Sequence, residues 1–196
     1  MRYHDITKDD MKNGDGLRVC LWVAGCDHCC KECQNPQTWD PNGGIPFDEA
    51  AKAEIFEQLD KSYIAGITFT GGDPLYFGNV ETVTNLAREI KEKYPDKTVW
   101  MYTGFTWEAV RSLPVMEYVD VLVDGEYKAA ERDVTLMWKG SANQRVIDVQ
   151  RSVKCPDGSP VIHCPDYYKV EDMAPQIADP SAGWCVLEQG RKVRIC

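Results

Sequence analysis

Four cysteines crowd into eight consecutive residues of this chain, at Cys26, Cys29, Cys30 and Cys33. The spacing Cys26-x3-Cys30-x2-Cys33 places three thiolates in one short loop. Three such ligands can hold three irons of a 4Fe-4S cube and leave the fourth iron open to another molecule. An open coordination position is a feature of reactive metal centres, whereas complete protein ligation suits structural sites. The loop therefore predicts a 4Fe-4S cluster with one reactive iron.

The cysteine spacing admits two other interpretations. Structural zinc is the first, because Cys26-x2-Cys29 and Cys30-x2-Cys33 are formally two CxxC pairs. Zinc ribbons, however, separate such pairs by about 15–20 residues, and here no residue separates them. Buried structural thiols are the second, but four cysteines in a polar loop would bury little. We expect Cys29 to be a bystander thiol and His28 to order the loop through hydrogen bonds.

Composition excludes several function classes. The 196 residues suffice for one domain of ordinary size with a modest appendage. The 22 Lys and Arg residues are outnumbered by 31 Asp and Glu, and the net charge of −9 argues against binding of a nucleic-acid backbone. No stretch approaches the ~20 apolar residues of a membrane span, and the N-terminal residues do not form a signal peptide. Nine cysteines, an odd number, favour a reducing, cytoplasmic location over a disulfide framework.

Strand-like and helix-like segments alternate along the first 150 residues. Asp48 and Asn79 are predicted N-caps of two helices, and a short helix is expected to begin near Thr106. This alternation, with little period-2 patterning, favours a parallel sheet buried on both faces. The predicted strands cover residues 17–23, 64–69, 98–102, 118–123 and 145–149.

Chemically distinctive segments follow the predicted strands. They are the cysteine loop, Gly71-Gly72-Asp73-Pro74, Thr103-Gly104 and Asp124-Gly125. In parallel α/β folds the carboxyl edge of the sheet is where ligands bind. A complete eight-stranded barrel typically needs about 250 residues. We therefore expect an α/β fold with an incomplete (β/α) barrel of about five parallel strands and an open side.

The chain is expected to divide near residue 151. Residues 1–151 would form the partial-barrel domain, and residues 152–196 a cysteine-containing C-terminal extension of unknown role, rich in turn residues. This extension carries Cys155, His163, Cys164, Cys185 and Cys196, whose spacings match no common zinc template.

The motifs together resemble a known family. Cys26-x3-Cys30-x2-Cys33 followed by Gly71-Gly72-Asp73-Pro74 is similar to the radical S-adenosylmethionine (SAM) enzymes. Asn13-Gly14-Asp15-Gly16-Leu17-Arg18 resembles an element of the activases that install glycyl radicals in partner enzymes, with Asp15 in place of the usual proline. The stretch from about residue 3 to residue 145 is similar to the family of anaerobic ribonucleoside-triphosphate reductase-activating proteins. That similarity includes Gly25-Cys26-x-His28-x-Cys30-x-x-Cys33-x-Asn35, Thr38-Trp39, Trp100-x-x-Thr103-Gly104, Val123-Asp124-Gly125, Trp138-x-Gly140-Ser141 and Asn143-Gln144.

The resemblance implies a radical SAM fold and a specific reaction. SAM would bind the open iron, and an electron from reduced flavodoxin or a similar donor would cleave it to a 5′-deoxyadenosyl radical. That radical would abstract hydrogen from a glycine of the anaerobic (class III) ribonucleoside-triphosphate reductase. No catalytic side chain is implied beyond the cluster and the SAM site.

The resemblance also assigns residues. Cys26, Cys30 and Cys33 would bind the cluster, and the SAM contacts would come from Glu32, Cys33, Gln34, Gly71, Gly72 and Asp73. Glu32 and Gln34 stand where the family commonly has a glycine and an aromatic residue. Two rival hypotheses remain: a radical SAM enzyme that rearranges a small heterocycle, and a zinc-binding adaptor.

Overall fold

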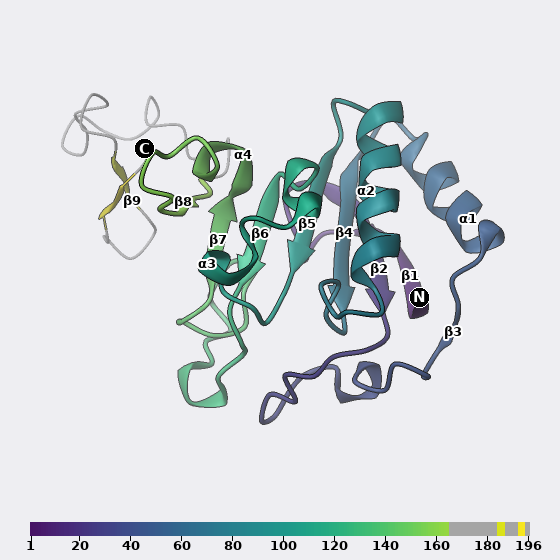
Figure 1. The fold of residues 1–196 in the computed structure, drawn as a ribbon, viewed down its shortest axis with the longest axis horizontal. Coiled ribbons are helices and arrows are strands. Elements are labelled where there is room, and N and C mark those ends of the chain that lie inside the picture. Colours follow the sequence, from purple (N-terminus) through teal and green to yellow (C-terminus); the bar gives the residue numbers. More distant parts are fainter. Residues whose placement is uncertain (165–183, 187–191, 195–196) are drawn as a thin grey trace.

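An open, eight-stranded sheet forms the centre of the fold (Figure 1). The computed structural model describes residues 1–164 and the strand segments 184–186 and 192–194. In spatial order the strands of the sheet are β3-β1-β2-β4-β5-β6-β7-β8. Their bounds are β1 Arg2–Asp10, β2 Leu17–Val23, β3 Ile45–Pro46, β4 Ile64–Gly71, β5 Thr98–Tyr102, β6 Val121–Asp124, β7 Arg145–Asp148 and β8 Val161–Ile162.

The sheet is parallel only in its middle. Strands β2, β4, β5 and β6 run parallel, whereas β1, β3, β7 and β8 pair antiparallel with their neighbours. The α/β class is therefore confirmed, but the sheet has more strands than expected, its margins are antiparallel, and it does not close. A parallel pair needs a crossover connection, usually a helix. The β6–β7 connection contains only the short 3-10 helix η3, Ala129–Glu131, so the chain returns antiparallel beside β6.

Helices follow the predicted caps, with one difference. The main helices are α1 (Glu49–Leu59) and α2 (Val80–Lys93), and the shorter ones are α3 (Trp107–Val110), α4 (Val149–Ser152), η1 (Pro36–Thr38) and η2 (Pro114–Glu117). Asp48 caps α1 by accepting a 2.9 Å hydrogen bond from the Ala51 amide. Asn79 occupies the N-cap position of α2 but donates its side-chain amide to the Ala24 and Asp73 carbonyls instead. Within the described part of the chain, no helix is long and apolar enough to cross a membrane.

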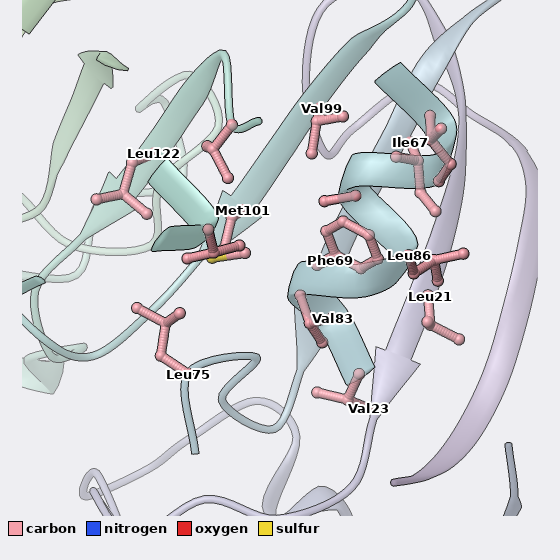
Figure 2. Packing of buried hydrophobic residues seen from close by; sticks show 14 of the residues in the cluster. Leu21, Val23, Ile67, Phe69, Leu75, Val83, Leu86, Val99, Met101 and Leu122 are labelled. Carbon is pink, nitrogen blue, oxygen red and sulfur yellow. The ribbon is translucent and has the colours of Figure 1, made fainter. Parts of the chain in front are cut away.

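The main hydrophobic core lies between α2 and the sheet. Figure 2 shows Val83 and Leu86 of α2 against Phe69 of β4, with side chains of β2 and β5 around them. Phe69, Ile67, Val99 and Met101 are fully buried. Apolar positions at helical spacing on α2 thus cover the alternate residues of the parallel strands.

The opposite face of the sheet buries Arg18. Its guanidinium donates to Thr68 Oγ1 at 2.8 Å, to the Ile67 carbonyl at 2.7 Å and to both oxygens of Thr98, and it lies over the Trp100 ring. Burial lowers the pKa of Arg18 to about 10. The Gly-rich element that ends in this arginine therefore stabilises the amino ends of the strands, away from the cysteine loop.

Residues 152–164 add to the margin of the sheet. Strand β8 pairs with β7, and the buried Trp107 donates its indole N–H to the Gly158 carbonyl at 3.0 Å. His163 Nε2 lies 2.7 Å from Asp15 Oδ2, beside the amino end of β2. Further on, β9 (Trp184–Val186) pairs with β10 (Lys192–Arg194), while Cys196 lies outside the described residues. The predicted division at residue 151 stays a prediction.

Candidate functional site

The cysteine loop leaves the carboxyl end of β2. In Figure 1 the arrowheads of the parallel strands point to the edge where this loop and the exits of β4, β5 and β6 lie. Backbone hydrogen bonds fix the base of the loop: the Gly25 amide donates to the Thr38 carbonyl at 2.8 Å, and the Cys26 amide to the Trp39 carbonyl at 3.1 Å. The expectation that the chemically distinctive segments share one edge of the sheet is therefore confirmed.

The three predicted cluster ligands are partly shielded from solvent. Cys26, Cys30 and Cys33 are half-buried, whereas Cys29 is exposed and adopts a left-handed backbone with φ 48°. Burial raises the pKa of the Cys26 thiol to about 11, with smaller contributions from the charge of Asp73 and from Cys30, and burial likewise raises the pKa of Cys30. Metal cations reverse this tendency because they stabilise the thiolate directly.

This donor set fits a cube bound by three cysteines. Each thiolate of a 4Fe-4S cube binds a different iron, so the ligands need not meet around one ion. Among the described residues, no group of three or more His, Cys, Asp or Glu side chains is arranged around a single metal position. Cys26, Cys30 and Cys33 stay the predicted cluster ligands.

Gly71 and Gly72 let the exit of β4 lie against the base of the cysteine loop. The Gly72 amide donates to the Val23 carbonyl at 2.8 Å, and a Cβ on Gly72 would lie only 2.5 Å from the Gly25 carbonyl oxygen. Gly71 has φ +96°, which L side chains rarely adopt. Both glycines thus have a backbone reason for their identity, and their contact with SAM stays a prediction.

Asp73 is the most heavily engaged side chain at this edge. It is 2% exposed, and its carboxylate accepts hydrogen bonds from the amides of Leu75 (2.8 Å) and Gly104 (3.0 Å) and from the Thr103 hydroxyl (2.9 and 3.0 Å). His28 Nε2 lies 2.8 Å from the same carboxylate. Donors of this chain therefore surround the group that the sequence assigned to SAM, and that assignment stays a prediction.

Thr103 and Gly104 were not among the predicted site residues. The structure places them in contact with Asp73 across the β4–β5 pair. A Cβ on Gly104 would lie 2.4 Å from the His28 ring, so only glycine leaves room for that ring. A Thr-Gly pair after a strand is a common turn sequence. The signals in the sequence were its place at a strand end and its part in the motif Trp100-x-x-Thr103-Gly104 of the family resemblance.

His28 joins the cysteine loop to the other strand exits. Besides its contact with Asp73, its Nδ1 lies 3.1 Å from Glu126 Oε1, and its ring meets Phe105 edge-on at 4.6 Å between centroids. The hydrogen bond to Asp73 is the main cause that raises the pKa of His28, and Glu126 adds to it. The expected hydrogen bonds of His28 are present, and they reach the exits of β4 and β6.

Asp124 anchors the exit of β6. It is 1% exposed, accepts a 2.7 Å hydrogen bond from the Trp107 amide and pairs with Arg145, which also makes a two-bond contact with Glu108. Its partners give this residue a structural role at the strand end.

Glu32 and Gln34 lie on the outer part of the cysteine loop. Both flank Cys33 and are exposed, and Glu32 has a left-handed backbone with φ 58°. Their side chains are accessible to a ligand at the loop, and their contact with SAM stays a prediction.

Comparison with known proteins defines the class first. Residues 12–147 match the family described as 4Fe-4S single cluster domain, which spans the cysteine loop and all four parallel strands. Fold, loop and match together define an iron–sulfur cluster protein.

Individual relatives narrow this class. An anaerobic ribonucleoside-triphosphate reductase-activating protein of Enterobacteria phage T4 is 42% identical over 146 residues, which cover 74% of this chain and 93% of the relative. Proteins with the same name from Pasteurella multocida and Escherichia coli K12 are each 37% identical over 150 residues, covering 74% of this chain and 95% and 97% of the relatives. The chain belongs to the family of anaerobic ribonucleoside-triphosphate reductase-activating proteins.

Proposed function

We propose that this protein is a radical SAM activase that installs the glycyl radical of an anaerobic ribonucleoside-triphosphate reductase. The observation that carries the proposal is the loop of Cys26, Cys30 and Cys33 at the carboxyl edge of parallel strands, inside a region similar to nearly the whole length of activating proteins. When bound, the cluster and SAM supply a 5′-deoxyadenosyl radical, formed with an electron from reduced flavodoxin or a similar donor.

The chain contributes position and shielding to this chemistry. Partial burial of the three thiols would limit the access of water to a bound cluster, and the backbone hydrogen bonds at Gly25 and Cys26 hold the loop at the sheet edge. SAM would lie between the loop and the glycines Gly71 and Gly72. Positioning of this kind is the main contribution that a protein makes to cofactor chemistry.

The open sheet supports a protein substrate. In this proposal the sheet is the incomplete (β/α) barrel of the radical SAM type, and its unclosed side admits a loop of the reductase. A glycyl radical is delocalised over its flanking amides, so an activase can generate it and then dissociate.

The test compares cysteine variants under anaerobic conditions. Wild type and Cys29→Ala, reconstituted with iron and sulfide, should bind a cluster, cleave SAM and produce a glycyl radical on the reductase, detected by electron paramagnetic resonance. Cys26→Ala, Cys30→Ala and Cys33→Ala should each lose all three properties. A reductase whose acceptor glycine is replaced by alanine serves as the control.

Two outcomes would contradict the proposal. If the wild type cleaves SAM efficiently only with a small-molecule substrate and leaves the reductase without a radical, the activase function is wrong. If Cys29→Ala loses the cluster while Cys30→Ala keeps it, the ligand assignment is wrong. Iron and zinc analysis of the purified protein separates the iron–sulfur enzyme from a zinc-binding adaptor.

A further inference from the structure

The exits of the four parallel strands are connected through one imidazole and two carboxylates. His28 belongs to the loop after β2, Asp73 follows β4, Thr103 and Gly104 follow β5, and Glu126 follows β6. The connecting distances are 2.8 Å from His28 Nε2 to Asp73, 2.9 Å from the Thr103 hydroxyl to Asp73, and 3.1 Å from His28 Nδ1 to Glu126.

Asp73 is fixed independently of His28. Its carboxylate is 2% exposed and accepts from the Leu75 amide of its own turn and from the Thr103 hydroxyl and the Gly104 amide of the β5 exit. The cysteine loop, in contrast, contains exposed residues and two left-handed non-glycine residues, Cys29 and Glu32. His28 is thus the side chain by which the loop that carries the thiols is attached to the rigid carboxylate of the β4 exit.

Packing restricts the imidazole further. Phe105 lies edge-on against it, and Gly104 has no side chain in the space that the ring occupies. The side chain of His28 is only 12% exposed, although its loop lies at the surface. In this packed orientation the ring reaches both carboxylates, Asp73 through Nε2 and Glu126 through Nδ1.

We infer that His28 is a positioning residue that holds residues 26–33 of the cysteine loop against Asp73 of the β4 exit, beyond the base of the loop, where backbone hydrogen bonds already join the two segments. This inference rests on the proposed function, because SAM would occupy the space between these two segments. In this inference His28 orients the SAM site, whereas the three thiols hold the cluster. Removal of the imidazole should leave the cluster bound to the three thiols but weaken the binding of SAM between the cysteine loop and the β4 exit.

The test uses the full chain with its cluster reconstituted anaerobically. His28→Ala should retain the iron content of the wild type but bind SAM about tenfold more weakly, the effect expected for loss of one hydrogen bond to a charged group. SAM affinity is read from the change in the electron paramagnetic resonance spectrum of the reduced cluster. His28→Gln, whose amide can still donate to Asp73, should restore affinity to within about threefold, and His4→Gln on β1 is the matched control.

Hydrogen exchange provides a readout without the cofactor. In cluster-free protein, His28→Ala should speed amide exchange in residues 26–33, while the Leu75 and Gly104 amides, which donate to Asp73, stay protected. Should His28→Ala fail to fold, Glu126→Ala removes the exposed partner of the ring and should weaken SAM binding in the same direction by a smaller factor.

The outcomes separate this inference from the proposed function. If the wild type itself fails to hold a cluster or to respond to SAM, the proposed function fails. If the wild type responds but His28→Ala, or Glu126→Ala in its place, binds SAM equally well, the inference is overturned. Loss of the cluster from His28→Ala, to the extent seen for Cys30→Ala, would also overturn it, because His28 would then be required for cluster binding and not only for the orientation of the SAM site.

Discussion

A variant of Thr103 can measure how much the hydrogen bonds to the Asp73 carboxylate stabilise the fold. Thr103 is 6% exposed, and its hydroxyl donates to Asp73 and accepts from the Phe105 amide at 3.2 Å. Thr103→Val keeps the shape and removes these bonds, leaving a buried carboxylate with fewer donors. Hydrogen bonds to charged groups contribute about 1.5–3 kcal/mol each. We therefore expect Thr103→Val to lower the free energy of unfolding by about this amount.

The measurements are urea and thermal unfolding of the full chain without its iron–sulfur cluster, monitored by circular dichroism. For a chain of this size the expected loss corresponds to a decrease in Tm of about 3–12 °C. Thr103→Ser is the matched control, because it keeps the hydroxyl and loses only a methyl group, at a cost of about 0.8 kcal/mol. If Thr103→Val is as stable as the wild type, or if Thr103→Ser is less stable than Thr103→Val, the hydrogen bond to Asp73 does not stabilise the fold as argued.

Three further predictions concern the fold. Phe69→Ala, in the centre of the main core, should lower the free energy of unfolding by about 3–5 kcal/mol, and a loss below 1 kcal/mol in urea titration would contradict the packing described. Arg145 lowers the pKa of Glu108 to about 2 from 4.5, so their contact should stabilise fully above pH 4.5 and be lost as pH falls through 2. Glu108→Gln should therefore be less stable than the wild type at pH 7 and equally stable at pH 2; an equal difference at both values would refute this. Truncation after Arg151, which removes β8, should lower the Tm more than truncation after Cys164, and calorimetry showing the reverse would contradict the role of β8.

Local sequence determined the central strands and the helix starts. The apolar run of residues 17–23 is a strand over the same residues in the structure, and α1 begins after Asp48 as its capping side chain indicates. Strand propensity, apolar patterning and capping act over a few residues, so they can be recognised without knowledge of the fold. The cysteine loop is local in the same sense, because all its thiols lie within eight residues.

Sheet margins could not be predicted in this way. Local sequence does not predict strand β1, because polar residues fill most of its length although Tyr3 and Ile6 are buried. The direction of β7 depends on how the β6–β7 connection folds, which its own residues do not indicate. Asn79 shows the same limit: its sequence position is that of a cap, but neighbouring carbonyls of Ala24 and Asp73 take its amide.

The sequence by itself determined the residues on which the proposed chemistry rests, because covalent order sets the spacing of Cys26, Cys30 and Cys33 and places two glycines after β4. Only the tertiary structure decided what surrounds that chemistry. His28 and Thr103 reach Asp73 from positions 45 and 30 residues away, and this depends on the register of the parallel strands. Strand register is fixed by burial of the whole sheet face, so such contacts appear only when the complete chain has folded.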